Sequence, residues 1–552
     1  MTVCHNRGMT PTSRKSASTA PSRSSTLAHP WIALVFLSLA LSLIVIDGTI
    51  INVSLPTIMR DLELTFTQAQ WLTTSYALIF SALLITVGRL ADNWGRRNIL
   101  LAGIAIFVIA SIIAGTARTF APLLIARFLQ GIGAAAVSPT TLSTVNATFT
   151  GKRRMIAFAV WGSVISGMAA VGPLLGGWIT TNTTWPWIFL INVPIGIIVA
   201  LGCIFFVPNT YGERSEHGFD AGGFITSSIG FAALVYALIQ GRDLGWWKPI
   251  NEDWASWPLS PVPLAAALAA VLLGFFIWWE RRQLRVDGPH VLNLNLFKLR
   301  SFSAGNVAAA AISVGEFGLL FALPLYLQNV RMLTPLQSGG VLAAMAAGAF
   351  IAGGSASPLG RLFSATWVAR AGLAIESIAV FSLAISLTAH TPIAVIVTAL
   401  VAYGFGLGLA SAQLTSVILV DVPPSTSGQA SATQSTTRQV GTALGIALVA
   451  TFLAASVNSQ VQGSLDDVPL PEQARHGIEA SVAPSAGASI RALTDSDGSE
   501  GVPAELTDQV IDKLSEAFSV GTSHAMGVAG AALGLGCALT FFLPGARKPS
   551  GE

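Results

Sequence analysis

Apolar runs separated by short polar segments repeat along most of this 552-residue chain. A helix needs about 20 mostly apolar residues to cross the ~30 Å hydrocarbon layer of a membrane. By that measure the chain holds about fourteen membrane-spanning helices. They are expected at approximately 31–53, 70–89, 99–117, 121–141, 156–179, 187–207, 222–240, 262–279, 303–327, 338–356, 367–388, 392–418, 428–455 and 524–543. A β-barrel would show short alternating segments instead, so the pattern predicts an all-α membrane protein.

The composition agrees with this prediction. Hydrophobic residues make up 52% of the chain and charged residues 10%, whereas soluble globular proteins carry about 25% charged residues. Lys and Arg collect in the cytoplasmic loops of membrane proteins. One side of the predicted path collects Arg96, Arg97, Arg153, Arg281 and Arg547 among others, and the opposite side has few. With an even number of spans, this bias predicts a multi-pass protein of the cytoplasmic membrane with both termini in the cytoplasm.

Residues that bind metals or perform covalent catalysis are scattered along the chain. Cys4, Cys203 and Cys537 lie far apart, and the seven histidines are likewise dispersed. The phosphate-binding pattern Gly-x-x-x-x-Gly-Lys-Ser/Thr does not occur, and no nucleophile–base pair is evident. We therefore expect no metal site, no cofactor and no enzymatic activity. A formal net charge of +3 gives no reason to expect a nucleic-acid partner.

A short charged turn separates the second predicted span from the third. Its distinctive residues are Gly88, Arg89, Asp92, Gly95, Arg96 and Arg97. The turn resembles the loop between the second and third spans of major facilitator superfamily transporters, whose pattern is Gly-x-Leu-Ala-Asp-x-x-Gly-Arg-Arg/Lys. The resemblance implies a cytoplasmic latch that holds one conformational state. The alternative is an ordinary hairpin between two membrane helices.

The first predicted span contains an acid, Asp47, and an amide, Asn52. A carboxylate inside a membrane span is energetically costly and usually faces a cavity where it has a function. The run from Asp47 to Pro56 resembles the first-span signature of the fourteen-span drug:proton antiporters of the same superfamily. The resemblance assigns proton coupling to Asp47 and a place in the transport cavity to Asn52. The alternative is a carboxylate that only packs against a partner.

The fourth predicted span contains Arg127, followed by Gln130, Gly131 and Gly133. These residues match the family pattern Arg-x-x-Gln-Gly-x-Gly, in which the arginine is associated with proton coupling. Arg127 and Asp47 each lie six residues from the predicted external end of their span, or roughly 9 Å at ~1.5 Å per residue. Opposite charges at equal depth are able to pair. The alternative is an arginine that binds only backbone carbonyls.

The fifth predicted span carries small residues and a proline at Gly167, Gly172, Pro173, Gly176 and Gly177. Small residues let a neighbouring helix approach closely, and a proline bends its own helix. The segment resembles the antiporter signature Gly-x-x-x-Gly-Pro-x-x-Gly-Gly, although its first spacing is one residue longer. This resemblance favours export over uptake.

Three further charges lie deep in predicted spans of the C-terminal half. Glu316 and Arg438 are expected to line the transport cavity if this half repeats the arrangement of the N-terminal half. Glu376 falls in a span that the resemblance makes peripheral, and we expect it to be structural.

The resemblance implies a major facilitator fold with two six-helix bundles and two additional central helices. It predicts a disordered cytoplasmic tail (1–30), an N-terminal bundle (31–208) and two additional helices with linkers (209–285). The C-terminal bundle follows, with its first five helices at 286–455, an acidic extracytoplasmic loop at 456–522, and the last span with a short cytoplasmic tail at 523–552. The loop is interpreted as a solvated linker with a short surface helix, or alternatively as a gate at the outer mouth.

The function implied is proton-coupled antiport that exports amphipathic, hydrophobic or cationic drugs by alternating access. The expected partners are the lipid bilayer, small-molecule substrates and protons, with no obligate protein partner and a monomeric state. One alternative is a dedicated exporter of a metabolite or a self-made antibiotic on the same fold. A remote alternative is a membrane sensor or scaffold that transports nothing.

Overall fold

The computed structural model describes residues 30–149, 153, 157, 168, 171–211, 220–250, 257–286, 288–292, 294–422, 427–495 and 503–543. The long helices are α1 (Pro30–Asp61), α2 (Phe66–Trp94), α3 (Arg96–Thr116), α4 (Phe120–Thr148), α7 (Asn192–Phe206), α8 (Ala221–Leu244), α9 (Pro261–Arg285), α10 (Arg300–Asn329), α11 (Pro335–Phe363), α12 (Ala365–Ser386), α13 (Ile393–Leu419), α14 (Ser427–Val461) and α17 (Ala504–Leu539). Shorter helices are α6 (Trp187–Leu190), α15 (Glu472–Val482) and α16 (Ala488–Asp495). Residues 171–182 are also helical, and the described residues contain no strand.

Twelve helical segments of the described chain are long and apolar enough to cross a membrane. The prediction of an all-α, multi-pass membrane protein is therefore confirmed. The 29-residue helix α2 is not among these twelve, and most of the fifth predicted span (156–179) lies outside the described residues. The count of fourteen spans stays a prediction.

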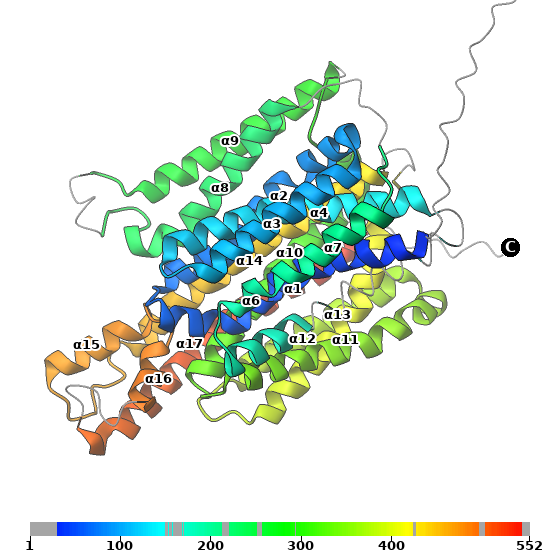
Figure 1. Cartoon of the computed structure of the whole chain (residues 1–552). Helices are drawn as coiled ribbons and strands as arrows, with labels where there is room; N and C mark the ends of the chain where they lie inside the picture. The colour runs from blue at the N-terminus through cyan, green and yellow to red at the C-terminus, as the bar shows by residue number, and fades with distance from the viewer. Residues whose placement is uncertain are drawn as a thin grey trace, which may run out of the picture.

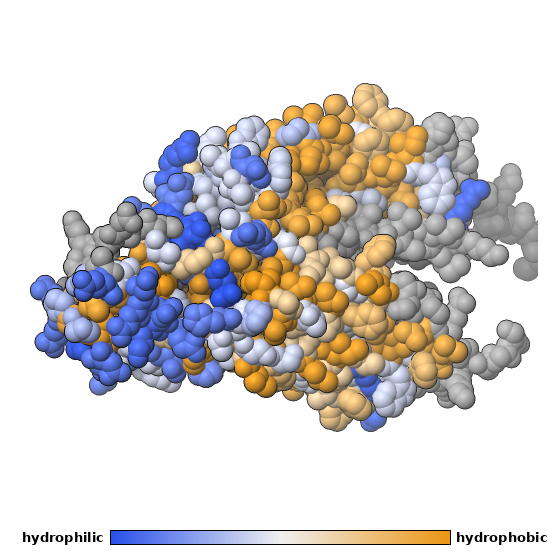
Figure 2. Space-filling model, turned by 90° about the horizontal axis from the view of Figure 1, so that it is seen from below, coloured by the Kyte–Doolittle hydropathy of each residue, from blue (hydrophilic) through white to orange (hydrophobic). Residues whose placement is uncertain are grey.

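The long helices run between two ends of the molecule, as Figure 1 shows. At one end, on the right of the figure, α1 begins, and we call it the tail end. At the opposite end, on the left, lie α15 and α16, and we call it the cap end. The surface seen in Figure 2 is apolar over the middle of the helices and hydrophilic at the cap end. That division is the one expected of a protein that spans a bilayer and projects beyond it on one side.

The described helices form an N-terminal half, α1–α7 with residues 171–182, and a C-terminal half, α10–α14 with α17. The two additional helices are central in the sequence, but in space they lie on one flank (Figure 1). α8 contacts α2 of one half and α14 of the other, while α9 packs chiefly on α8. Leu264, Leu268 and Val271 of α9 are exposed. The expectation that both helices lie between the bundles is therefore wrong for α9, whose apolar face is left for lipid.

In the acidic region 456–522, the described residues form packed helices and not a solvated linker. α14 continues to Val461, and α17 starts at Ala504 and runs without interruption into the last span. The predicted surface helix is therefore the first part of α17. Ile490, Val510 and Leu514 are fully buried where this part of α17 meets α16. We call α15, α16 and residues 504–518 of α17 the cap.

Candidate functional site

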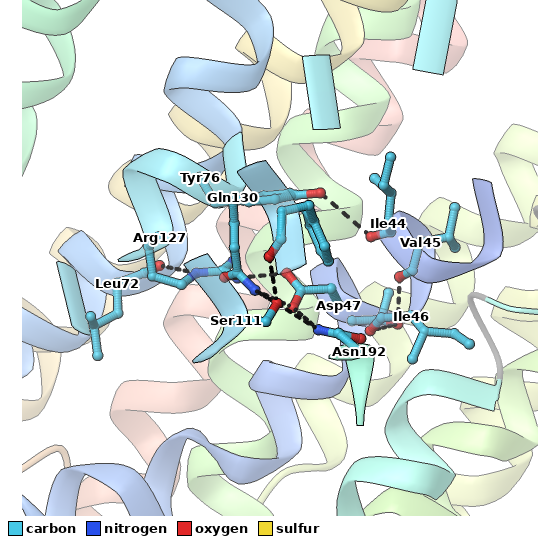
Figure 3. Close-up of polar contacts among 12 residues, drawn as sticks. Ile44, Val45, Ile46, Asp47, Leu72, Tyr76, Ser111, Arg127, Gln130 and Asn192 are labelled. Carbon is cyan, nitrogen blue, oxygen red and sulfur yellow. Dashed lines mark hydrogen bonds and ion pairs between the residues drawn. The ribbon is translucent and has the colours of Figure 1, made fainter. Parts of the chain in front are cut away.

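A buried polar cluster joins five helices of the N-terminal half around Asp47 of α1 (Figure 3). The Asp47 carboxylate is 0% exposed and the Arg127 side chain of α4 is 1% exposed. The Arg127 Nη1 atom donates to Asp47 Oδ2 at 2.7 Å. Gln130 and Asn192 each donate from their amide nitrogens to Asp47 Oδ1, at 2.8 and 3.0 Å. Both carboxylate oxygens are thus satisfied, as burial of a charge requires.

The arginine is held as completely as the acid. Its Nε atom donates to the Leu72 carbonyl of α2 at 3.1 Å, and its Nη1 atom also donates to Gln130 Oε1 at 2.8 Å. The guanidinium lies over the Tyr76 ring, 4.4 Å from its centroid, a favourable cation–π geometry. Ser111 Oγ of α3 accepts from the Gln130 amide at 3.0 Å. The cluster therefore joins α1, α2, α3, α4 and α7 through one hydrogen-bonded network.

Part of this network escaped the sequence analysis. Gln130 belongs to the pattern Arg-x-x-Gln-Gly-x-Gly, which associates a role with the arginine alone. Asn192 stands in the segment after the Trp185-Pro186-Trp187 turn, and Ser111 stands in an otherwise apolar span. A buried asparagine at the start of α7 was a usable signal, because buried amides need partners. Ser111 gave no signal.

The predicted pair forms, and α1 is longer than the predicted first span. α1 continues past Val53 to Asp61, which puts Asp47 roughly 21 Å from that helix end at ~1.5 Å per residue. α4 starts at Phe120, which leaves Arg127 about 10 Å from its own helix end. Asn52 is buried in α1 at 6% exposure, and no hydrogen bond described for the Asp47 cluster includes it.

The C-terminal half holds a looser charged cluster. Arg438 Nη2 of α14 lies 3.7 Å from Glu316 Oε2 of α10, and the side chains are 43% and 13% exposed. Glu376 of α12 is 0% exposed. Arg438 and Glu376 line one small cavity with Gln434 of α14, which donates to Thr415 of α13 at 3.1 Å. The structure thus brings Glu376 to the same cluster as the two residues predicted to line the transport cavity.

The charged turn after α2 contacts its own half of the molecule. Gly95 has φ of +93°, a region that favours glycine. Arg96 Nη1 donates to the Ser143 carbonyl of α4 at 3.1 Å, and Arg97 Nη1 lies 3.4 Å from the Val207 carbonyl after α7. A Cβ atom at Gly88 would make an ordinary contact with Pro139. The side chains of Arg89 and Asp92 lie outside the described part of the structure, so their predicted clamp stays a prediction.

The glycines of the fifth predicted span allow close backbone contact on two faces. A Cβ atom at Gly176 would lie 2.7 Å from the Ile50 carbonyl oxygen of α1, and one at Gly172 would collide with Thr49. A Cβ atom at Gly177 would lie 2.5 Å from the Pro335 carbonyl oxygen of α11, in the other half. Gly167 lies outside the described residues. The described part of the motif therefore joins α1 to the interface between the halves.

Comparison with known proteins identifies the family. The sequence profile of the Major Facilitator Superfamily matches residues 37–446. This chain belongs to the Major Facilitator Superfamily. This chain is 31% identical over 447 residues to the multidrug resistance protein Stp of Mycobacterium tuberculosis. The alignment covers 81% of this chain and 80% of Stp. The chain is 27% identical to the tetracenomycin C resistance and export protein of Streptomyces glaucescens, covering 93% and 91% of the two chains.

A solved structure has the same fold. It is a bacterial homologue of the human lysosomal transporter Spinster in an inward-facing and occupied conformation. The two chains share 18% identity with a TM-score of 0.59, over 92% of this chain and 95% of the other. The superfamily member therefore has the major facilitator fold and is a multi-pass protein of the cell membrane.

Proposed function

We propose that this superfamily member is a proton-coupled antiporter that exports amphipathic, hydrophobic or cationic small molecules by alternating access. Its relatives include a named multidrug resistance protein and a named resistance and export protein. Energy would come from the proton gradient, and we expect no enzymatic activity and no cofactor. The observation that carries the proposal is the buried Asp47–Arg127 pair.

The geometry at Asp47 suits a proton-operated switch. An ionised Asp47 binds Arg127, Gln130 and Asn192 and so holds α1 against α4 and α7. A proton on Asp47 would remove its negative charge and weaken these charge-assisted hydrogen bonds. Because α1 would then be held less tightly, the two bundles would be free to change their relative tilt.

The contacts between the halves suggest which side of the transporter is closed. Gln328 of α10 donates to the Val53 carbonyl at 2.7 Å, and the Leu336 amide of α11 donates to Thr181 at 3.0 Å. The Phe66 amide of α2 donates to the Pro484 carbonyl beside the cap. All of these residues stand at the cap end. We assign this end to the exterior and both termini to the cytoplasm, from the basic residues of the loops. On that assignment the protein is closed to the outside.

The test uses purified protein in liposomes with an imposed pH gradient and tetraphenylphosphonium, a lipophilic cation, as the transported probe. Asp47→Asn should abolish gradient-driven transport with normal membrane insertion, because the amide cannot carry the proton. The matched control is Asp61→Asn on the same helix, whose carboxylate binds only the Trp185 indole in the described structure. Full coupled transport by Asp47→Asn would overturn the proposal.

A dedicated exporter of one metabolite or self-made antibiotic is the second candidate. It is favoured by the similarity to a resistance and export protein named for a single compound. A panel of growth-inhibition measurements on expressing and empty cells separates the two candidates. Resistance to several unrelated compounds supports multidrug export, and resistance confined to one compound supports the dedicated exporter.

A further inference from the structure

Glu376 is a buried acid without the partners that a structural acid has. Its side chain is fully buried in α12. Neither carboxylate oxygen has a hydrogen-bond partner among the described residues. Its neighbour Ser377, in contrast, donates to the Gly530 carbonyl of α17 at 3.1 Å. This bond holds α12 against α17 beside Glu376.

The surroundings of Glu376 include a second acid and one arginine. The charged and titratable groups of the described chain that interact with Glu376 are Glu316 on α10, Tyr403 on α13, Arg438 on α14 and Cys537 on α17. Arg370, on α12 itself, is held by the Thr540 carbonyl. The Tyr403 hydroxyl is buried and also lacks a partner among the described residues. Among the described residues, Glu376 therefore shares a cluster with a second acid, Glu316, and with the cation Arg438.

The cavity beside Glu376 admits water but not a drug. Its lining is mostly apolar, with Ile312, Leu373, Ala410 and Leu414 beside Gln434 and Arg438. Its free volume is about 20 Å³. That is enough for about one water molecule, whereas drug-sized ligands need pockets of roughly 300–1,000 Å³. The chemistry that fits the cavity is therefore a proton delivered or removed by water.

One arginine beside two acids leaves one of the acids without a counter-ion. Arg438 lies 3.7 Å from Glu316 and is partly exposed, so it offsets that carboxylate first. An ionised Glu376 would then be a buried negative charge with no hydrogen bond and a like charge nearby, which is strongly unfavourable. We propose that Glu376 carries a proton in this state and serves as a second proton-binding residue of the transport cycle.

This inference rests on the proton-coupled antiport proposed above and adds a site to it. When the C-terminal half rearranges and water enters the cavity, the carboxyl O–H bond of Glu376 breaks and the proton passes to that water. The carboxylate that remains is stabilised by Arg438 of α14, which lines the same cavity. Glu316 and Glu376 then share one arginine, so that ionisation of either acid competes with that of the other.

The first test measures the proton directly, without transport. Infrared spectra of the protein in membranes, recorded as the pH is raised, should show the carbonyl stretch of a protonated carboxyl group that persists to neutral pH. Glu376→Gln should remove this band, and Glu376→Asp should restore a shifted one. The control is Glu479→Gln, which alters a buried cap carboxylate that already accepts from the Leu465 amide. A spectrum unchanged in Glu376→Gln would mean that Glu376 is ionised, and it would overturn the proposal.

The second test counts protons in liposomes that contain tetraphenylphosphonium and a pH-sensitive dye. Glu376→Gln should lower the number of protons moved per cation by about one, while cation–cation exchange without a pH gradient persists. An unchanged ratio would overturn the coupling role. A wild type that moves the cation without protons would overturn the proposed antiport itself. In that case the infrared band would still decide whether Glu376 holds a proton.

Discussion

In the N-terminal half, Asp47 accepts hydrogen bonds from the Arg127, Gln130 and Asn192 side chains. In the C-terminal half, Glu316 meets Arg438 at 3.7 Å, and Glu376 meets no donor among the described residues. The arginines differ in the same way, since Arg127 is 1% exposed and Arg438 is 43% exposed. One half encloses its ion pair in a hydrogen-bonded network, and the other leaves its arginine partly exposed beside a small cavity.

This difference in burial and hydrogen bonding indicates that the two halves have different roles in transport. A buried pair in which both carboxylate oxygens accept hydrogen bonds is costly to break, and it holds its helices in one arrangement until the charge itself is removed. A partly exposed pair is worth little in stability and exchanges partners easily. We therefore expect the Asp47 site to set the conformation, and the partly exposed Glu316–Arg438 pair to respond to the substrate.

The largest effect should follow the loss of the enclosed arginine. Arg127→Met leaves Asp47 buried and unpaired, and removing one partner of a buried pair lowers the free energy of unfolding by about 3–5 kcal/mol. Thermal unfolding of the purified protein in detergent measures this change. The double variant Asp47→Asn/Arg127→Met should recover part of the loss, because no unpaired charge remains.

The matched comparison is Arg438→Met in the other half. Its pair is partly exposed, so the expected cost is under about 1 kcal/mol. Equal destabilisation by the two arginine variants would contradict the contrast between an enclosed site and an open one. A double variant in the N-terminal half that is no more stable than Arg127→Met would contradict the role given to the unpaired Asp47.

The sequence predicted the pairing of Asp47 with Arg127 better than the length of α1. Arg127 was found because it is an isolated charge in an apolar span and stands in a family pattern. Its pairing with Asp47 followed from counting residues from the expected span ends. The true end of α1 is Asp61, because the helix continues past the apolar run toward the cap end, and hydropathy alone does not mark that continuation.

The remaining features of both sites depend on which helix faces meet. Ser111 and Asn192 join the Asp47 network from α3 and α7, and a single sequence does not show which face of one helix meets another. For the same reason Glu376 was expected to be structural. α12 was assigned to the periphery, yet the face with Glu376 lies toward the Arg438 cavity. The packed cap was missed because its acidic composition resembles that of a solvated linker.

A smaller effect should follow a change in the packing that supports the enclosed site. Gly176→Ala places a Cβ atom 2.7 Å from the carbonyl oxygen of Ile50, one turn along α1 from Asp47. Because backbone must move to make room, we expect a loss of about 1–3 kcal/mol in the free energy of unfolding, together with slower transport of every substrate. Thermal unfolding and liposome transport measure the two effects.

Gly274→Ala on α9 is the control for this substitution. A Cβ atom there would meet nothing within 4 Å, and alanine favours a helix over glycine by up to about 1 kcal/mol. The control should therefore be neutral or slightly stabilising, with unchanged transport. If Gly176→Ala behaved like its control, the close contact between the fifth span and α1 would not support the Asp47 site.

The smallest effect on stability should come from Glu316, and its effect on transport should depend on the substrate. The carboxylate is only weakly paired with Arg438, so Glu316→Gln should change the free energy of unfolding by less than about 1 kcal/mol. A lipophilic cation gains from a carboxylate in a region of low dielectric, and a neutral molecule gains nothing from that charge. Export of tetraphenylphosphonium should therefore fall more than export of neutral triphenylphosphine oxide, at equal expression in liposomes. Equal loss for both compounds would mean that Glu316 takes part in proton coupling or folding. No loss for either compound would leave Glu316 as a packing residue, and the C-terminal half would then bind cations by another route.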